Sequence, residues 1–312
     1  MQDVFWLTLS SVGMILIYIG IGYFLRRHHD LPEDAGKVLS LLCILVFSPA
    51  YSIANLSKTF TRDVVWEKLI ILGYGAIFSV VAFVVAVVLA GIFAKEHKER
   101  NALIYAFFIP NTGYFGYPVI QMVFGAEVLS DAMVFLLPLN LATNTIGYLL
   151  FMDDKKISWR RVFLSPLIIA QLIGIAVGLS GWVMPALLRN TLTNLGGCMS
   201  PASMLLAGFM MGKFPLKRLL TGSRSYVLSL VRLVGIPLIF GAILLLCGMK
   251  GDFLLLPMLA VGLPLGLNLV VFPESLGNEQ MASENAKSCC VSYLLAVVLL
   301  PIVFSVVTHL AQ

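Results

Sequence analysis

Long apolar runs, each about 20 residues and separated by short polar connections, most limit what this chain can fold into. A run of that length matches the thickness of a bilayer core. In lipid every backbone polar group must be satisfied within the segment, so each run predicts a helix. Hydrophobic residues make up 59% of the 312 and charged residues only 12%, which is more apolar surface than a soluble core buries. The sequence predicts an all-α polytopic membrane protein with ten spans, at Val4–Leu25, Ala35–Leu56, Leu69–Ala94, Ala102–Phe124, Ala132–Met152, Ser165–Val183, Asn194–Gly212, Ser225–Gly248, Phe253–Leu276 and Ala286–Leu310.

The distribution of basic residues predicts which side of the membrane each connection faces. If the N-terminus lies outside, fifteen of the 21 Lys and Arg residues fall in connections or span ends on the inner side and five on the outer side. Inner connections of membrane proteins carry an excess of Lys and Arg. We therefore expect both termini outside the membrane. Because the basic residues lie in short connections, we expect no nucleic-acid partner.

The fourth span contains a segment that cannot continue as a regular helix, Phe107–Gln121 (FFIPNTGYFGYPVIQ). Proline removes a backbone donor and clashes with the preceding turn, and glycine adopts conformations that other residues resist. The residues expected to interrupt the helix are Pro110, Gly113, Gly116 and Pro118. Backbone groups freed at membrane depth are tolerated only inside protein or beside a water-filled cavity. A Pro-kinked packing helix is the alternative interpretation, but it does not explain the polar side chains of Asn111 and Thr112.

Two features of the first half recur about 152 residues later. The tripeptide Ser-Pro-Ala at positions 48–50 of the second span returns at 200–202 of the seventh, and the ninth span has a second break at Pro264–Asn268, which contains Gly266. These matches favour two five-helix repeats, and an odd number of spans forces the second repeat to run inverted through the membrane. We expect a first repeat over 1–152, a cytoplasmic linker over 153–163 and a second repeat over 164–312.

If the two broken helices cross near the middle of the membrane, the ends of their half-helices meet there. Half-helix N-termini are positive dipole ends that attract anions. We therefore expect an anionic group to bind at the crossing, where the residues in reach are Asn111, Thr112, Gly113, Gly116 and Asn268. Asn140 and Asn144 share a face of the fifth span by their i,i+4 spacing and are further candidates. Hydrogen bonds between neighbouring helices explain Asn268, Asn140 and Asn144 about as well.

Acidic residues and histidines are missing from the interior of the predicted spans. All 16 Asp and Glu and all four His lie in loops or near span ends, so a proton relay within the membrane is disfavoured. Neutral oxygens of Asn, Thr, Ser and freed carbonyls could still hold a coupling Na⁺. The five cysteines show no metal-ligand spacing, and no hydrolase or metalloprotease motif occurs. We expect no cofactor, no metal site, no catalytic residue and no enzyme activity.

Arg232 is the one basic residue predicted well inside a span. An ionisable residue within the membrane is a functional candidate by default. It lies roughly 10 Å from the predicted inner end of its helix, within partial snorkelling reach of the surface. Snorkelling or structural pairing is one interpretation of Arg232, and attraction of an anionic substrate is the other.

The segment Pro110–Pro118 (PNTGYFGYP) resembles the Pro-Asn-Thr and Gly-x-Pro motif on the fourth helix of the auxin efflux carrier family. This family includes bacterial carriers of malate or malonate and the plant auxin exporters. Leu263-Pro264 with Asn268 is similar to the ninth-helix motif of the bacterial members, and this likeness implies a location in the plasma (inner) membrane of a bacterium. Length and predicted span number agree with the family over the whole chain.

The resemblance implies the fold of bile-acid/sodium symporters and sodium/proton antiporters, in which helices four and nine cross in a transport domain and helices one, two, six and seven form a scaffold. It implies secondary transport of a mono- or dicarboxylate by an elevator-like movement, with Asn111 at the carboxylate. The chain lacks the long central loop of the plant members and has Leu265 where they carry a polar residue, which argues against auxin itself. Sodium symport, facilitated flux, an ion channel and a non-transporting solute sensor are the alternatives.

The expected partners are a small carboxylate and membrane lipid. Glycine-rich faces on the first and sixth predicted helices permit a homodimer, and they permit packing within one chain equally well.

Overall fold

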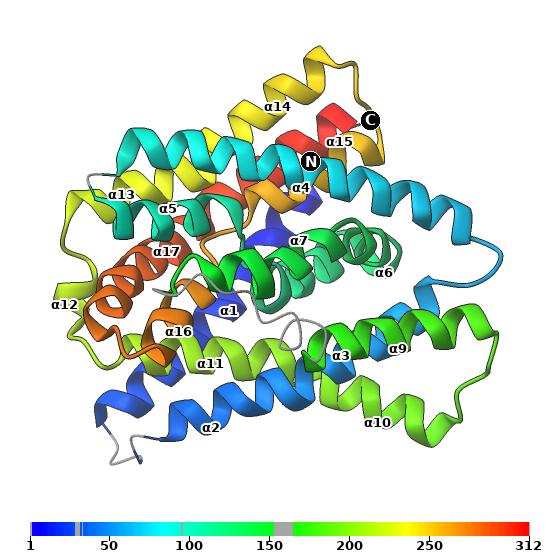
Figure 1. The fold of residues 1–312 in the computed structure, drawn as a ribbon, viewed down its shortest axis with the longest axis horizontal. Coiled ribbons are helices and arrows are strands. Elements are labelled where there is room, and N and C mark those ends of the chain that lie inside the picture. Colours follow the sequence, from blue (N-terminus) through cyan, green and yellow to red (C-terminus); the bar gives the residue numbers. More distant parts are fainter. Residues whose placement is uncertain (1, 29–31, 33, 95, 153–164, 312) are drawn as a thin grey trace.

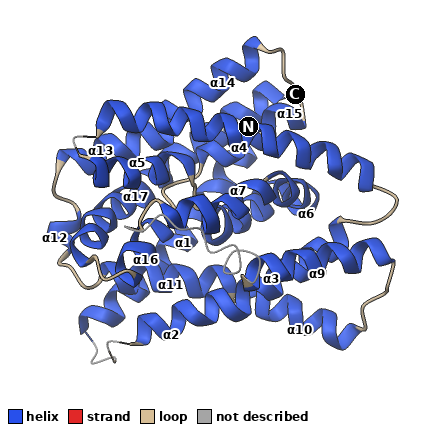
Figure 2. Cartoon of the chain, in the orientation of Figure 1, coloured by secondary structure: helices blue, strands red, loops and turns tan. Residues whose placement is uncertain are grey.

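The computed structural model describes residues 2–28, 32, 34–94, 96–152 and 165–311, and these are almost entirely helical (Figures 1 and 2). These residues form no β-strand, but Pro110 and Leu265 form an isolated antiparallel β-bridge. Six segments are long and apolar enough to cross a membrane, namely Asp3–His28, Ala35–Thr59, Val65–Phe93, Thr112–Phe135, Ser223–Leu246 and Glu279–Ala311. The prediction of an all-α polytopic membrane protein is confirmed. The count of ten spans stays a prediction, and the predicted linker 153–163 lies outside the described residues.

The first half of the chain forms long helices followed by a run of shorter ones. Its elements are α1 (Gln2–His28), α2 (Ala35–Leu42), η1 (Cys43–Phe47), α3 (Ser48–Thr59), α4 (Val65–Phe93), α5 (His97–Phe108), η2 (Thr112–Gly116), α6 (Tyr117–Phe135), α7 (Leu137–Ala142) and η3 (Thr143–Gly147). The helix α2–η1–α3 runs on without a gap and corresponds to the second predicted span. Within α6, Gly125 has φ +85° and ψ −177°, so the residues before and after it belong to two helices. That backbone conformation is essentially restricted to glycine.

The second half contains a second interrupted helix near its end. Its elements are α9 (Pro166–Ser180), α10 (Ala186–Gly197), α11 (Met199–Met211), α12 (Leu216–Leu219), α13 (Ser223–Leu230), η4 (Val231–Gly235), α14 (Ile236–Leu246), α15 (Asp252–Gly262), α16 (Asn268–Ser275) and α17 (Glu279–Ala311). The two termini lie toward the same side of the molecule, while the ends of α1, α4 and α16 lie at the opposite side (Figure 1).

In the part of the chain that the structure describes, four π-helical turns interrupt the α-helices, and a proline follows three of them. Pro49, Pro118 and Pro237 each occupy the first turn of the α-helix that continues after η1, η2 and η4. A proline has no N–H for the carbonyl four residues before it, and the wider π turn is one way for the backbone to adjust. Pro118, which was expected to contribute to the helix break, follows the π turn η2, and the chain leaves helical geometry before that turn, between Phe108 and Thr112.

Close backbone contacts join α1 to α11 and α3 to α9. A Cβ atom at Gly22 would lie 2.1 Å from the carbonyl oxygen of Leu205, and one at Gly208 would lie 1.9 Å from that of Ile19. A Cβ atom at Gly178 of α9 would lie 2.4 Å from the carbonyl oxygen of Phe60, just after α3. Small residues allow helices in lipid to approach this closely. Any side chain at these glycines would force the paired helices apart.

Candidate functional site

The two helix breaks touch each other. The N–H of Asn111 donates to the carbonyl oxygen of Pro264 at 3.0 Å, and Pro110 and Leu265 form the antiparallel β-bridge. A Cβ atom at Gly266 would lie 3.1 Å from the carbonyl oxygen of Ile109. Each break therefore supplies some of the backbone hydrogen-bond partners that the other has lost. The breaks predicted near Pro110 and Pro264 exist, and they meet although they lie in different halves of the sequence.

The long helix α17 supports this crossing from behind. The hydroxyl of Ser292 accepts a hydrogen bond from the N–H of Leu265 at 3.1 Å. The side-chain amide of Asn111 donates to the hydroxyl of Tyr293 at 3.0 Å, and the ring of Tyr293 stacks on that of Phe115. Because these groups are buried, water does not compete for their hydrogen bonds. The bonds therefore hold the crossing against α17.

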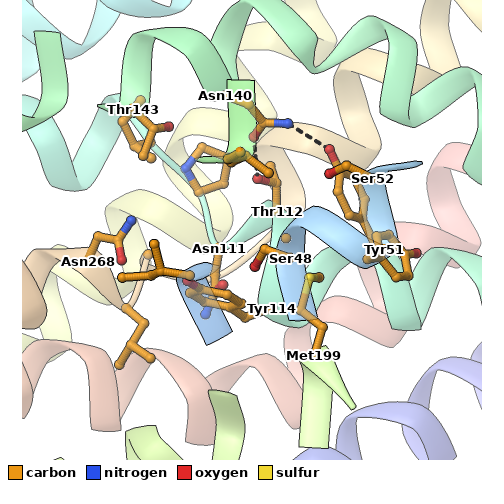
Figure 3. Close-up of a pocket in the computed structure, with 18 of the residues that line it drawn as sticks. Ser48, Tyr51, Ser52, Asn111, Thr112, Tyr114, Asn140, Thr143, Met199 and Asn268 are labelled. Atoms are coloured by element: carbon orange, nitrogen blue, oxygen red, sulfur yellow. Dashed lines mark hydrogen bonds between the residues drawn. The ribbon is translucent and has the colours of Figure 1, made fainter. Parts of the chain in front are cut away.

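A cavity of about 130 Å³ adjoins the crossing (Figure 3). One wall contains the first residues after each break, 111–114 and 266–268. The opposite wall comes from α3, α9 and α11, and its polar or polarisable residues are Ser48, Tyr51, Ser52, Gln171 and Met199. Among the described residues that line the cavity, none is Lys, Arg, His, Asp or Glu. A cavity of this size holds several water molecules or a small ligand.

Most of the predicted site residues meet at this cavity. Asn111 and Thr112 are buried in its wall, and Asn140 and Asn268 are half-buried there. The hydroxyl of Thr112 donates to the side-chain oxygen of Asn140 at 3.1 Å, and the Asn140 amide donates to the hydroxyl of Tyr117 at 2.8 Å (Figure 3). These bonds fix Thr112 and Asn140 relative to each other.

The two predicted glycines have different surroundings. A Cβ atom at Gly113 would meet only the terminal methyl of Met199, at 3.9 Å, so this position borders open space. A Cβ atom at Gly116 would lie 2.4 Å from a methyl carbon of Leu263. Gly116 thus allows the crossing to pack and does not line the cavity. The backbone of Asn144 lies in η3, and its side chain lies outside the described part of the structure.

Arg232 does not line the cavity, and only 1% of its surface is exposed. Its Nη1 donates to the carbonyl oxygen of Phe107 at 2.8 Å, its Nε to that of Leu263 at 3.0 Å and its Nη2 to that of Ala260 at 3.4 Å. The side chain is held inside the protein and does not reach for the membrane surface. Of the two interpretations of Arg232, the contacts favour structural pairing.

Sequence reasoning missed the tyrosines of the cavity wall. The hydroxyl of Tyr105 is fully buried beside Asn268 without a hydrogen bond of ordinary geometry, and the hydroxyl of Tyr51 also has none among the described residues. Both residues line the cavity, as do Tyr114 and Tyr117. Tyrosine in membrane proteins concentrates at the two interfaces. Tyr114 and Tyr117 lie deep inside a predicted span, which was an available signal, whereas Tyr51 and Tyr105 lie near the ends of theirs and gave none.

The electrostatics of the cavity come from backbone ends and neutral side chains. Thr112 begins the helix η2–α6 and Asn268 begins α16, so two helix N-termini border the same space. The first N–H groups of a helix have no partner within it, and together they carry a partial positive charge. Hydroxyls and amides surround them. The arrangement can donate several hydrogen bonds to an anionic or strongly polar group.

These observations define a polytopic membrane protein with a solute-sized polar cavity between helices. The model of the family described as "Membrane transport protein" matches residues 8–157 and 150–304. The chain belongs to this family, and the resemblance to auxin efflux carriers is confirmed. A protein of Methanocaldococcus jannaschii described as the uncharacterized transporter MJ1031 is 27% identical over 222 residues, which cover 68% of this chain and 71% of that protein. The chain is a transport protein and not an enzyme.

Proposed function

We propose that this protein is a secondary transporter of a small organic anion, a mono- or dicarboxylate, which it binds in the cavity beside the crossing. One observation carries the proposal. Two helix N-termini and two buried tyrosine hydroxyls, which make no hydrogen bond of ordinary geometry within the described part of the chain, border a single cavity whose described lining has no charged side chain. Positive helix ends favour an anion. No lining carboxylate competes for them.

The unpaired hydroxyls of Tyr51 and Tyr105 support a bound acceptor. Leaving a buried hydroxyl without a partner costs about 1–3 kcal/mol. A carboxylate has two oxygens that together accept about four hydrogen bonds. In the cavity it would take them from these hydroxyls and from N–H groups at the two helix N-termini other than those of Thr112, Leu269 and Val270, which have backbone partners. Binding would thus give these hydroxyls a charged acceptor within the cavity.

The position of the cavity supports an elevator-like movement. The pairs α1–α11, α3–α9 and α3–α10 pack closely and would form the scaffold, while the crossing of α5–α6 with α15–α16 and its support α17 would form the moving part. The cavity lies between residues of the two groups, with Met199 of α11 facing Gly113 of the first break. A sliding of the crossing past α3 and α11 would move a bound anion with it.

We further propose the repeat and membrane topology expected from the sequence. Ten spans would form two inverted repeats over 1–152 and 164–312, with both termini outside the inner membrane. The termini lie on the same side in Figure 1, opposite the ends of α1, α4 and α16, which supports an even number of crossings. The basic residues near those ends, such as Arg26 and Lys213, favour the cytoplasm for that side.

Binding and flux experiments test the proposed function. Purified protein in detergent is heated in NaCl or KCl at equal ionic strength, with acetate, malonate, malate or indole-3-acetate. A ligand that binds only the folded state raises the melting temperature. We expect a rise with at least one carboxylate and counterflow of that carboxylate in proteoliposomes. A rise that needs Na⁺ identifies symport, a rise without counterflow identifies a sensor, and no rise contradicts the carboxylate site.

A further inference from the structure

We propose that Arg232 is a positioning residue of the anion site, whose guanidinium joins and neutralises the C-terminal ends of α5 and α15. Arg232 would thereby fix the positions of the two helix N-termini that face the cavity. It would also keep the electrostatic potential at those N-termini positive. This inference rests on the proposed function. It assigns Arg232 a part in binding, although the side chain does not line the cavity.

The three carbonyls that Arg232 binds lie where the breaks remove regular backbone partners. In a continuous helix the carbonyl of Ala260 would accept from the N–H of residue 264, but Pro264 has none, and the N–H of Leu263 reaches this carbonyl only at 3.4 Å. The carbonyl of Phe107 would accept from the N–H of Asn111, which donates to Pro264 instead. Buried carbonyls without donors are costly in a membrane. Arg232 supplies the donors that the two breaks withdraw.

The geometry of the guanidinium lets a single side chain serve both breaks. Nη1 reaches α5 from one side, while Nε and Nη2 reach the end of α15 from the other. A planar guanidinium presents five N–H donors in a fixed fork, whereas a lysine ammonium is a compact point charge with three donors on one nitrogen. Arg232 therefore links two half-helices that come from different halves of the chain.

The charge of Arg232 is balanced by helix ends and not by a carboxylate. The four ion pairs found among the described residues do not include it, and its neighbours are mainly apolar, with Phe78, Ala82 and Phe240 among them. Each helix C-terminus carries about half a negative charge, so the ends of α5 and α15 together offset about one positive charge. Arg232 supplies that charge inside the protein.

This balance has a consequence on the cavity side of the crossing. The N-termini of η2–α6 and α16 together carry about one positive charge by the same estimate. With the nearby C-termini neutralised by Arg232, that charge is left for a ligand. Without Arg232, the two negative ends would reduce the attraction for an anion, and the half-helices would lose their common anchor. Both the weaker attraction and the loss of the anchor would lower the affinity for a carboxylate.

The experiment compares Arg232→Met, Arg232→Lys and the control Arg224→Met with the unchanged protein. Arg224 lies in the same helical run, but it is partly exposed and pairs with Glu99 at the surface. Carboxylate affinity is measured from the melting temperature during titration with whichever of acetate, malonate, malate and indole-3-acetate binds the unchanged protein best. We expect at least a tenfold loss for Arg232→Met, a smaller loss for Arg232→Lys and no loss for Arg224→Met. Guanidinium at about 10 mM should restore affinity to Arg232→Met, and the same concentration of NaCl should not.

Unchanged affinity in Arg232→Met would overturn the proposal. If that variant cannot be purified as a monodisperse protein, the carboxylate affinity of Arg232→Lys tests the proposal, because a lysine cannot bind all three carbonyls. Lower affinity then supports the proposal and equal affinity overturns it. If the unchanged protein binds no carboxylate, the proposed function fails by itself. Hydrogen exchange at the Asn111 amide then tests the positioning role, which predicts faster exchange in the Arg232 variants and is overturned by equal exchange.

Discussion

The two helix breaks have similar backbones and very different side chains. The first, after α5, carries Asn111 and Thr112, and both are hydrogen-bonded to other helices. The second, after α15, carries Leu263, Leu265 and Leu267, which are at most 1% exposed. Only Asn268, at the far end of the second break, brings an amide to the cavity. The two breaks therefore share a backbone conformation but not the polar side chains that could bind a ligand.

The two breaks therefore have different roles, since the second mainly packs the crossing and the first supplies its polar contacts. Leu263 and Leu265 of the second break fill space behind the crossing, where Leu263 packs against Gly116, and Leu267 lines the cavity with an apolar side chain. The polar residues of the first break are already committed to Tyr293 and Asn140. The unpaired groups beside them belong to Tyr51 and Tyr105. The motif that identifies the family thus builds the site, and tyrosines outside the motif leave donors free for a ligand.

Replacing Gly116 by valine should have the largest effect on stability. A Cβ atom there would lie 2.4 Å from a methyl carbon of Leu263 and 3.3 Å from the carbonyl oxygen of Asn111, and both neighbours are buried. Overpacking of this kind costs about 1–3 kcal/mol, and we expect the upper end of that range. The melting temperature in detergent measures the effect. The matched control is Gly113→Ala, which meets only Met199 at 3.9 Å. Equal melting temperatures for the two variants would contradict the packing of the breaks.

Asn111→Ala should destabilise the protein by about 1–3 kcal/mol, because it leaves the buried hydroxyl of Tyr293 without its partner. It should also weaken carboxylate binding, since Asn111 precedes the helix N-terminus at the cavity. Thermal unfolding with and without carboxylate measures both effects. Asn268→Ala is the counterpart in the second break, and it should cost less than about 1 kcal/mol because its side chain is only half-buried. A larger loss of stability for Asn268→Ala than for Asn111→Ala would contradict the conclusion that the polar side chains of the first break are the more important ones.

Tyr105→Phe should leave stability almost unchanged and still weaken binding. The hydroxyl of Tyr105 makes no hydrogen bond of ordinary geometry, so its removal relieves an unsatisfied buried group. We expect a melting temperature equal to or slightly above that of the unchanged protein, with several-fold lower carboxylate affinity. Tyr293→Phe is the control, because its hydroxyl accepts from Asn111 and its loss should lower stability. Normal affinity in Tyr105→Phe would remove this hydroxyl from the ligand site.

The sequence predicted the parts of the site that follow from local chemistry. Proline and glycine at membrane depth indicated both breaks, and Asn111, Thr112, Asn140 and Asn268 were found from their polarity within apolar runs. The sequence did not show that the chain would accommodate Pro118 through the π turn η2 while leaving helical geometry only before Thr112. The π turns and the Gly125 bend depend on backbone register, which apolar periodicity does not resolve.

Other features depend on contacts between distant segments. The hydroxyl of Tyr105 matters because Asn268 and the cavity lie beside it, and nothing within α5 indicates this. The interpretation of Arg232 changed for the same reason. Snorkelling follows from its distance to a helix end, whereas its hydrogen bonds to Phe107, Ala260 and Leu263 require the folded crossing. Local rules locate unusual residues, and tertiary structure determines which partners they meet.

The hydrogen bond between Asn111 and Tyr293 spans 182 positions of the sequence. At a synthesis rate of about 5–20 residues per second, roughly 9–36 s separate the appearance of these two residues at the ribosome. During that interval the first break is made, but Tyr293 and Pro264 are not yet available to it. Its amide groups must be hydrated or held by the insertion machinery until α17 emerges. Synthesis that stops before α17 would therefore release a chain with unpaired polar groups in the membrane, a defect that cellular quality control can detect.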